Sequence, residues 1–276
     1  MSNISKILNK KFSVLDKGFI RVVDCMGDDS SIVQAARVSY GEGTKHVSKD
    51  KGLINYLMKH KHTSPFEMCE IKLHIKLPIF VARQWIRHRT ANVNEYSARY
   101  SVLSEDFYVP DINRICFQSE TNKQGSGSSV PSVLGGHFIS DIKKYSLDAY
   151  SLYKKYLDLG IAREIVRSML PINFYTEFYW KIDLHNLLHF LRLRSHSHAQ
   201  YEIREYSDII LYEIIKKWVP LSYDAFMEYQ YHSVNLSKKS LDIIKSKIKG
   251  DYKQSDKDNI SKRELEELEL YLGEKL

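Results

Sequence analysis

Apolar and polar residues alternate most clearly over residues 70–77, EIKLHIKL, where every second side chain is apolar. A period of two places the apolar side chains on one face of a strand, so this segment predicts a half-buried β-strand. Residues 19–24 (FIRVVD) alternate more weakly but are rich in β-branched residues, and residues 173–182 (NFYTEFYWKI) are aromatic and β-prone. The chain therefore predicts a sheet of several strands.

Helical spacing of apolar residues appears between and after these strands. Asp28 or Asp29 can cap a helix that runs to residue 38, and Pro78 suits the first turn of a helix after the 70–77 strand. Asp183 can cap another helix, LHNLLHFLRLR. Further helices are predicted over residues 50–60, 140–159, 162–169 and 199–218.

The longest predicted helix, residues 140–159, has a clear apolar stripe. Its members are Ile142, Tyr145, Ala149, Leu152 and Tyr156, which recur at steps of three and four. This stripe is predicted to face the core.

These elements together indicate an α+β fold, with a mixed or antiparallel sheet packed against a helical layer. Neither GxGxxG nor GxxxxGK[ST] occurs, so the fold is not expected to be a Rossmann fold. We expect one domain over residues 1–234, with a flexible loop insertion at the Gly- and Ser-rich residues 119–136. Residues 235–276 are charged without a continuous apolar stripe and predict a solvated helical tail.

Composition changes this picture in two ways. With 43% hydrophobic and 27% charged residues, and no apolar run near the ~20 residues that span a bilayer, the chain is expected to be a cytoplasmic globular protein without membrane contact. Lys and Arg exceed Asp and Glu by 41 to 34, which suggests an anionic partner such as nucleic acid, phosphate or a nucleotide.

The densest run of ligand-capable side chains is QWIRHRTANVNEYSARY, residues 84–100. Gln84, Arg87 and His88 are three and four positions apart, so a helix would present them on one face. After the RHR triplet the pattern becomes irregular, which predicts a loop that presents donors to a bound anion. Arginine binds phosphate oxygens in pairs, and Glu95 with the asparagines can contact ribose hydroxyls or base edges. An exposed charged helix end is the alternative, which the apolar neighbours of this run disfavour.

A second polar run is DLHNLLHFLRLRSHSHAQ, residues 183–200. His185 and His189 are four apart and share a helix face with Arg192. HxxxH is zinc-ligand spacing, but no Glu stands between the histidines and no third ligand is assigned, so no metal is the preferred interpretation. Either Arg192 or Arg194 is expected to face a pocket.

Together these segments resemble the flavin-dependent thymidylate synthases. Arg87-His88-Arg89, followed after seven residues by Ser97, reproduces that family's signature, and the wider form RHRTANVNEYSARYS also matches. HTSPFE, RSMLP and LRLRSHSHAQYEIREY occur in the family's order. The resemblance covers about residues 19–231 and leaves out the insertion and the tail.

The resemblance implies an enzyme that methylates dUMP to dTMP, with methylenetetrahydrofolate as carbon donor and FAD relaying reducing equivalents from NADPH. It also implies a homotetramer whose sites are shared between subunits. The implied FAD contacts are His62, Ser64, Arg87, His88, Arg89, Glu95, Asp183, His185 and His189, the last three in a variant of the family's pattern. The implied dUMP site is Gln84, Arg87, Glu95, Tyr96, Ser97, Ala98, Arg99, Arg167 and Arg194.

The resemblance makes Arg194 the catalytic arginine that sits against the uracil ring and favours ionisation at N3. A fixed guanidinium polarises the ring without giving up its proton, and so builds electron density at the weakly nucleophilic C5. The other route to an activated C5 is attack at C6 by a cysteine. None of Cys25, Cys69 and Cys116 lies in an evident polar cluster with a base, so the sequence favours the non-covalent route. Ser97 is interpreted as a phosphate donor instead of a nucleophile.

Two other classes of protein stay open as alternatives. A nucleic-acid-binding module would need Lys and Arg along one exposed face with stacking aromatics, whereas the lysines here are scattered, so no nucleic-acid partner is expected. A metal hydrolase would use the histidines near His185. At Arg167 a helix-end salt bridge and an anion contact are equally good interpretations.

Overall fold

The structure of the protein is a computed structural model that describes residues 4–38, 50–120, 125–253 and 260–276. The chain divides into two compact units, Met1–Tyr231 and His232–Leu276. Each unit has its own buried apolar cluster. All of the candidate site residues lie in the first unit.

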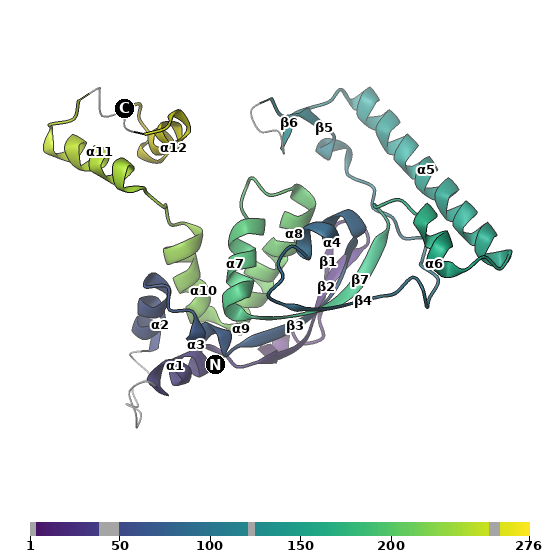
Figure 1. The fold of residues 1–276 in the computed structure, drawn as a ribbon, viewed down its shortest axis with the longest axis horizontal. Coiled ribbons are helices and arrows are strands. Elements are labelled where there is room, and N and C mark those ends of the chain that lie inside the picture. Colours follow the sequence, from purple (N-terminus) through teal and green to yellow (C-terminus); the bar gives the residue numbers. More distant parts are fainter. Residues whose placement is uncertain (1–3, 39–49, 121–124, 254–259) are drawn as a thin grey trace. The chain divides into compact units, whose positions relative to one another are not determined.

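The first unit is built on a five-stranded sheet in which every pairing is antiparallel (Figure 1). The strand order is β1-β2-β3-β7-β4, which places β3 at the centre. The bounds are β1 (Lys11–Val14), β2 (Gly18–Met26), β3 (Glu70–Pro78), β7 (Tyr175–Asp183) and β4 (Asn92–Glu95). The predicted α+β fold with an antiparallel sheet is confirmed, and such a sheet is not a Rossmann fold.

Strand β3 shows why the sheet has one inner and one outer face. Its alternating apolar side chains are fully buried, whereas Lys72, His74 and Lys76 between them are only half-buried. On this outer face His74 Nε2 lies 2.8 Å from Glu177 Oε2 of β7. The alternation of apolar and polar residues in the sequence therefore corresponds to the inner and outer faces of the sheet, as predicted.

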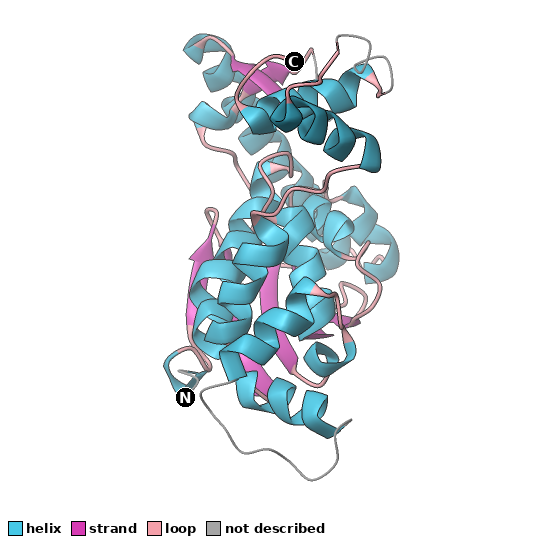
Figure 2. Ribbon diagram, turned by 90° about the vertical axis from the view of Figure 1, so that its left-hand side faces the viewer, coloured by secondary structure: helices cyan, strands magenta, loops and turns pink. Residues whose placement is uncertain are grey.

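Helices cover the inner face of the sheet, and Figure 2 shows them in front of the strands. Trp85 is the centre of this layer, since its ring lies 4.6 Å from that of Phe190 and 5.2 Å from that of Trp180. The helices of the unit are η1 (Ile4–Lys6), α1 (Asp29–Arg37), α2 (Asp50–Lys59), α3 (Ser64–Glu67), α4 (Ile79–Trp85), η4 (Ile112–Arg114), α5 (Ser132–Asp158), α6 (Arg163–Val166), η5 (Arg167–Met169), α7 (Leu184–Arg194), α8 (Tyr201–Ile209), η6 (Ile210–Ile215), α9 (Lys216–Trp218), α10 (Pro220–Phe226) and η7 (Met227–Tyr231).

Two predicted helix starts are confirmed by side-chain caps. Asp28 caps α1, with Oδ1 accepting a hydrogen bond from the Ser30 backbone N–H at 2.9 Å. Asp183 caps α7, with Oδ1 accepting from the Asn186 N–H at 2.9 Å. Each carboxylate satisfies an N–H of the first turn that has no partner within the helix.

The prediction for residues 84–100 was wrong in two respects. Helix α4 ends at Trp85, so Arg87 and His88 follow it in a turn and do not share a helical face with Gln84. The expected irregular loop contains β4, which pairs with β7 at the edge of the sheet. All of its side chains are exposed, so no alternation marked this strand in the sequence.

The apolar stripe predicted on α5 faces the core only in part, which corrects the expectation from spacing. Tyr145 is 62% exposed and Leu152 is 43% exposed, whereas Ser146, Ala149 and Tyr153 are buried. The buried face is fixed by hydrogen bonds, since Ser146 Oγ accepts from a side-chain amide and Tyr153 Oη accepts from the backbone of residue 103. Much of the apolar surface of α5 is therefore open to solvent.

The loop expected over residues 119–136 is also partly wrong. Strand β5 (Cys116–Gln118) pairs with β6 (Ser126–Ser129), and α5 already begins at Ser132. Residues 121–124 of the expected loop lie outside the described part of the chain. The small polar side chains of β6 are exposed, so its backbone pairing left no hydrophobic pattern to read.

The second unit contains the helices α11 (Lys238–Lys249) and α12 (Lys262–Leu272). Ser237 and Ser261 cap their starts, and glycines in the left-handed conformation follow their ends. Its buried cluster is small, consisting of Ile243, Leu268 and Leu276. Among the described residues, no helix of either unit is both long and apolar enough to cross a membrane.

Candidate active site

Arg194 connects the ends of two helices. Its Nε donates to His88 Nε2 at 3.1 Å, and one of its terminal nitrogens donates to the backbone carbonyl of Gln84 at 3.4 Å. Strands β3 and β7 are antiparallel neighbours, and α7 starts at the end of the sheet where β3 begins. Helix α7 therefore runs back across the sheet and brings Arg194 to the end of α4.

His88 is neutral in this arrangement. Burial, with help from the charges of Arg194 and His189, lowers the pKa of His88 from 6.5 to about 4. An imidazole that accepts at Nε2 carries its proton on Nδ1. Burial and the charge of Arg87 also lower the pKa of Arg194, but an arginine side chain keeps its proton in any case. The result is a guanidinium oriented by a neutral acceptor.

One histidine of α7, His189, lies close to His88. The rings of His88 and His189 lie 6.0 Å apart, and burial, with Arg192 and His185, lowers the pKa of His189. Asp183 uses its carboxylate to cap the helix, where Oδ2 also accepts from the Asn186 side chain at 2.7 Å. In the residues that the structure describes, no cluster of three or more His, Cys, Asp or Glu side chains is arranged to hold a metal ion.

Ser64 lies on the short helix α3, and His62 lies two residues before it in the chain. Ser64 opens α3, which packs against α7, while the buried Pro65 and Phe66 anchor α3 to the core. His62 is exposed directly before α3, and its backbone N–H donates to the Leu57 carbonyl at 2.9 Å.

Arg87 and Arg89 are exposed cations on either side of His88 in the chain, and the charge of Arg87 acts on Arg194. Within the described ranges, neither side chain makes a hydrogen bond or an ion pair with the protein. Two guanidiniums without partners among the described residues, next to the histidine that holds Arg194, make this region suitable for an anionic ligand. We refer to Gln84, Arg87, His88, Arg89, His189 and Arg194 as the Arg194 group.

A second set of predicted residues gathers around Glu164. Arg99 lies 3.8 Å from the Glu164 carboxylate, and Arg167 Nε donates to the Glu164 backbone carbonyl at 3.3 Å. Ser97 Oγ accepts from the Arg99 N–H at 3.3 Å, and Ala98 is 8% exposed. We refer to Ser97, Ala98, Arg99, Glu164 and Arg167 as the Arg99 group.

Glu95 and Tyr96 lead into the Arg99 group from strand β4. Glu95 Oε1 accepts from Thr176 Oγ1 at 2.6 Å, and the Tyr96 N–H donates to the Glu177 carbonyl at 2.8 Å. Both partners are on β7, so the pairing of β4 with β7 sets the position of these two residues.

No hydrogen bond or ion pair joins the Arg194 group to the Arg99 group in the described part of the chain. By their hydrogen bonds and ion pairs, most of the predicted dUMP residues thus fall into two sets. Gln84, Arg87 and Arg194 belong to one set, and Ser97, Ala98, Arg99 and Arg167 belong to the other.

Sequence reasoning missed three residues that hold the predicted ones. Gln84 Nε2 donates to Gln200 Oε1, Thr176 holds Glu95, and Glu164 lies between the two arginines of the Arg99 group. Gln200 could have been found from the sequence, because it is the last residue of the LRLRSHSHAQ segment. Thr176 and Glu164 gave no signal, since each sits in an ordinary strand or helix pattern.

The structure supports the argument against a cysteine nucleophile. Burial and nearby carboxylates raise the pKa of Cys25, and raise that of Cys69 to about 12. A thiol with a raised pKa is protonated near neutral pH and is a weak nucleophile.

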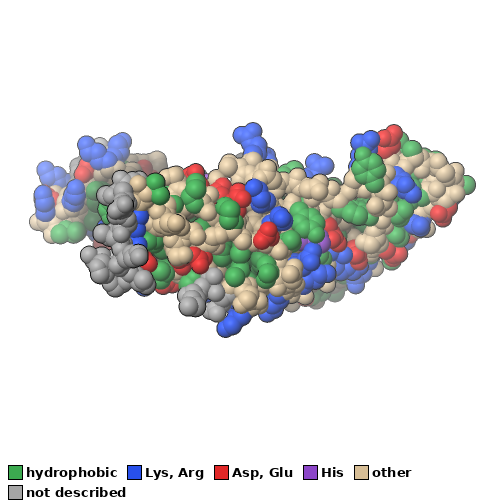
Figure 3. All heavy atoms as spheres, turned by 90° about the horizontal axis from the view of Figure 1, so that it is seen from below, with side chains coloured by type: hydrophobic (Ala, Val, Ile, Leu, Met, Phe, Trp, Pro, Cys, Tyr) green, Lys and Arg blue, Asp and Glu red, His purple; other side chains and the backbone are tan. Residues whose placement is uncertain are grey.

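On the face of the molecule seen in Figure 3, the Lys and Arg side chains of the described residues are interspersed with acidic and apolar ones. A strip of cations along one face, as long nucleic acids require, is not visible on that side.

Comparison with known proteins agrees with the family that the motifs indicated. The family Thy1, described as thymidylate synthase complementing protein, matches residues 21–221. This chain therefore belongs to the flavin-dependent thymidylate synthase family and is an enzyme, as its motifs predicted. The matched region contains both groups of residues described above.

Several relatives carry the name flavin-dependent thymidylate synthase. The one from Wolbachia pipientis wMel is 58% identical over 268 residues, which is 97% of this chain and 94% of the relative. The one from Rickettsia conorii (strain ATCC VR-613 / Malish 7) is 53% identical and spans 98% of this chain and 96% of the relative. Among solved structures, the UMP/dUMP methylase PolB from Streptomyces cacaoi bound with 5-Br dUMP has a TM-score of 0.72 and 31% identity, covering 81% of this chain and 100% of PolB.

Proposed function

We propose that this enzyme converts dUMP to dTMP by reductive methylation, with methylenetetrahydrofolate as carbon donor and FAD carrying reducing equivalents from NADPH. The observation that carries the proposal is the half-buried Arg194, held by the neutral His88 and the Gln84 carbonyl. The names of the relatives and the dUMP analogue bound to PolB support the choice of substrate.

Arg194 would act on the uracil ring without a covalent bond to the protein. Its Nε donates to His88 and one terminal nitrogen donates to the Gln84 carbonyl, so the remaining terminal N–H groups stay available for uracil N3 and the neighbouring carbonyl oxygen. A fixed cation there favours the ionised ring and raises electron density at C5. Because the guanidinium is already oriented, little reorganisation is needed when the substrate binds.

The residues around Arg194 fit the chemistry of FAD. Arg87 and Arg89 lack partners on the protein within the described chain, as expected for cations that bind a pyrophosphate. When bound, FAD supplies the carrier for two reducing equivalents. The residues proposed to hold it are His62, Ser64, Arg87, His88, Arg89, Glu95, Asp183, His185 and His189.

We propose that the Arg99 group binds the phosphate of dUMP and that the complete site combines the two groups from different subunits of a homotetramer. The absence of a hydrogen bond or ion pair between the two groups in the described part of one chain supports this arrangement, as does the apolar surface that α5 leaves exposed. Tyr145 and Leu152 are examples of that surface. The residues proposed to contact dUMP are Gln84, Arg87, Glu95, Tyr96, Ser97, Ala98, Arg99, Arg167 and Arg194.

The test is an absorption spectrum followed by a kinetic assay. We expect the purified protein to show flavin absorption and to oxidise NADPH faster when dUMP and methylenetetrahydrofolate are added, with dTMP as product. A colourless protein that takes up no added FAD, or a flavoprotein that forms no dTMP from dUMP, would overturn the proposal.

A further inference from the structure

A polar cavity of about 540 Å³ lies next to the Arg194 group and is used by none of the residues assigned above to FAD or dUMP. Its described lining comes from the ends of strands β5 and β6, from the segment before α8 and from the first turns of α8. Gln200 lines it, and the same side chain accepts a hydrogen bond from Gln84. A ligand in this cavity would therefore lie one side chain away from the Arg194 group.

Arg114 lines this cavity with unused hydrogen-bonding capacity. Its guanidinium stacks on the Tyr201 ring, with 3.8 Å between the guanidinium carbon and the ring centroid. Its Nε is buried and has no hydrogen-bond partner, and the side chain forms no ion pair with any described residue. A stacked guanidinium keeps its N–H edge free for an anion in the plane of the group.

Arg204 is a second cation in the lining. Its side chain donates from one terminal nitrogen to the Ser197 carbonyl at 3.1 Å, which leaves its other N–H groups available. The first residues of α8 line the cavity, so the positive end of this helix adjoins it. The cap residue, Gln200, makes no side-chain cap bond there. Ser126 and His198 add further hydrogen-bonding groups.

Two carboxylates lie near the arginines, but neither forms an ion pair with them in the described part of the chain. Glu202 lines the cavity, but its carboxylate already accepts from Gln200 Nε2 at 2.7 Å and from Tyr108 Oη at 3.2 Å. The charges of both arginines lower the pKa of Glu205, but burial and Asp208 outweigh them and its pKa is raised; no ion pair joins Glu205 to either arginine among the described residues.

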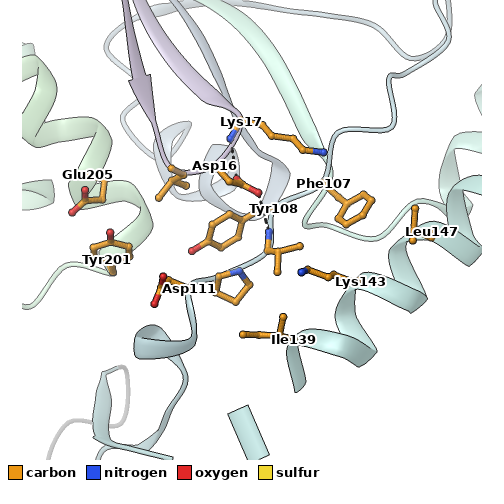
Figure 4. Close-up of a pocket in the computed structure, with 13 residues that line it drawn as sticks. Asp16, Lys17, Phe107, Tyr108, Asp111, Ile139, Lys143, Leu147, Tyr201 and Glu205 are labelled. Carbon is orange, nitrogen blue, oxygen red and sulfur yellow. Dashed lines mark hydrogen bonds between the residues drawn. The ribbon is translucent and has the colours of Figure 1, made fainter. Parts of the chain in front are cut away.

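A second cavity, shown in Figure 4, adjoins the first and has more carboxylates in its lining. It has a volume of about 790 Å³ and shares Tyr201 with the first cavity, but its lining includes the carboxylates of Asp16, Asp111 and Glu205. Lys143 points into it from α5. Three carboxylates thus line the cavity in Figure 4, whereas Glu202 is the one carboxylate among the described lining residues of the Arg114 cavity.

We propose that Arg114 and Arg204 bind the end of a ligand that carries two or more neighbouring negative charges, as phosphate or carboxylate oxygens. In the proposed reaction, both co-substrates have such an end, since NADPH carries phosphates and folates carry glutamate carboxylates. The inference goes beyond the proposed function, because the anion site is defined by the cavity and its arginines whatever the reaction is.

The experiment uses the full-length flavin-loaded protein, with dUMP at saturation so that its phosphate-binding residues are occupied. Pyrophosphate and triglutamate are titrated separately by calorimetry, as probes for phosphate and carboxylate ligands. We expect at least one probe to bind, and we expect Arg114→Gln and Arg204→Gln each to weaken it about tenfold, because a charge-assisted hydrogen bond is lost. The stronger probe identifies the type of co-substrate.

Two further variants control for folding and for nonspecific charge. Ser126→Glu places a carboxylate on the exposed hairpin beside both arginines and should abolish binding without altering them. Arg83→Gln removes an exposed arginine of α4 that does not line the cavity and should leave the affinity unchanged. Thermal unfolding of each variant confirms that the fold is intact.

Absence of binding by both probes, or equal affinities in the wild type and the two arginine variants, would overturn the inference. A protein that binds no dUMP would contradict the proposed function instead. The dependence of probe binding on Arg114 and Arg204 can still be measured in that protein, so the two failures are distinguishable.

Discussion

The two groups of predicted site residues differ in how firmly the chain holds them. Arg194 is half-buried and bonded to His88 and to the Gln84 backbone, so its orientation is set before any ligand arrives. Arg99 is more than half exposed and contacts Glu164 only in a surface ion pair, which contributes little free energy. A single chain therefore preorganises the residue proposed for ring activation and leaves the residues proposed for phosphate binding loosely held.

The largest effect is expected from Arg194→Ala. Loss of a preorganised charge at the reacting group lowers kcat by about 10²-fold to 10³-fold. Flavin absorption should persist, and dTMP formation measured by chromatography should fall. Arg192→Ala, on the same helix, is the matched control and should change kcat much less. Full turnover by Arg194→Ala would remove the contrast between the two groups.

Arg167→Ala should act mainly on substrate affinity. A lost arginine–phosphate contact raises the KM for dUMP by about tenfold to 100-fold, with a smaller change in kcat. Steady-state kinetics over a range of dUMP concentrations measures both constants. Arg163→Ala, an exposed arginine on neighbouring α6, should leave KM unchanged. If kcat fell and KM did not, the Arg99 group would belong to the chemistry and not to binding.

His88 is the positioning partner of Arg194, and its replacement tests that role. We expect His88→Phe to lower kcat about tenfold, because Arg194 loses an acceptor worth roughly one charge-assisted hydrogen bond. His88→Gln retains an acceptor oxygen and should recover part of the loss. Equal activity in the two variants at equal flavin content would show that the hydrogen bond does not orient Arg194.

The same residue gives a prediction about stability against pH. The folded protein keeps His88 neutral because its pKa is about 4, whereas the unfolded chain takes up a proton near the ordinary value of 6.5. Stability should therefore fall as the pH drops from 6.5 towards 4 and should not depend on His88 above 6.5. Thermal unfolding of wild type and His88→Gln across this range measures the difference, and parallel curves would contradict the assignment.

The smallest effect is expected from Glu164→Gln. The carboxylate pairs with Arg99 at 3.8 Å between exposed side chains, so the free energy of unfolding should change by less than about 1 kcal/mol. Urea unfolding gives that value. A loss of several kcal/mol would mean that the Arg99 group is as firmly held as the Arg194 group.

Elements with one buried face could be predicted from the sequence, and elements without one could not. Strand β3 alternates because one face packs on the helices, and Asp183 marked the start of α7 as a cap. Strands β4 and β6 have exposed side chains throughout, so backbone pairing alone defines them. On α5 the spacing was helical, but hydrogen bonds of Ser146 and Tyr153 turned a different face inward.

For the site, the residue types were in the sequence and their grouping was not. The RHR signature and the LRLR segment identified Arg87, His88, Arg89 and Arg194 as candidates. Their mutual position depends on α7 crossing back over the sheet to the end of α4, which follows from the antiparallel pairing of β3 with β7. The neutrality of His88 arises from burial beside Arg194, an environment that no local pattern encodes.

The sequence by itself determined the family, the α+β composition and the residue types of the site, because motifs, periodicity and caps depend on neighbours along the chain. Only the tertiary structure decided that Arg194 rests on His88, that Arg99 and Arg167 gather around Glu164, and that Arg114 and Arg204 share a cavity. Those relations join segments far apart in the chain, and they depend on strand pairing and burial, which bring distant residues into contact.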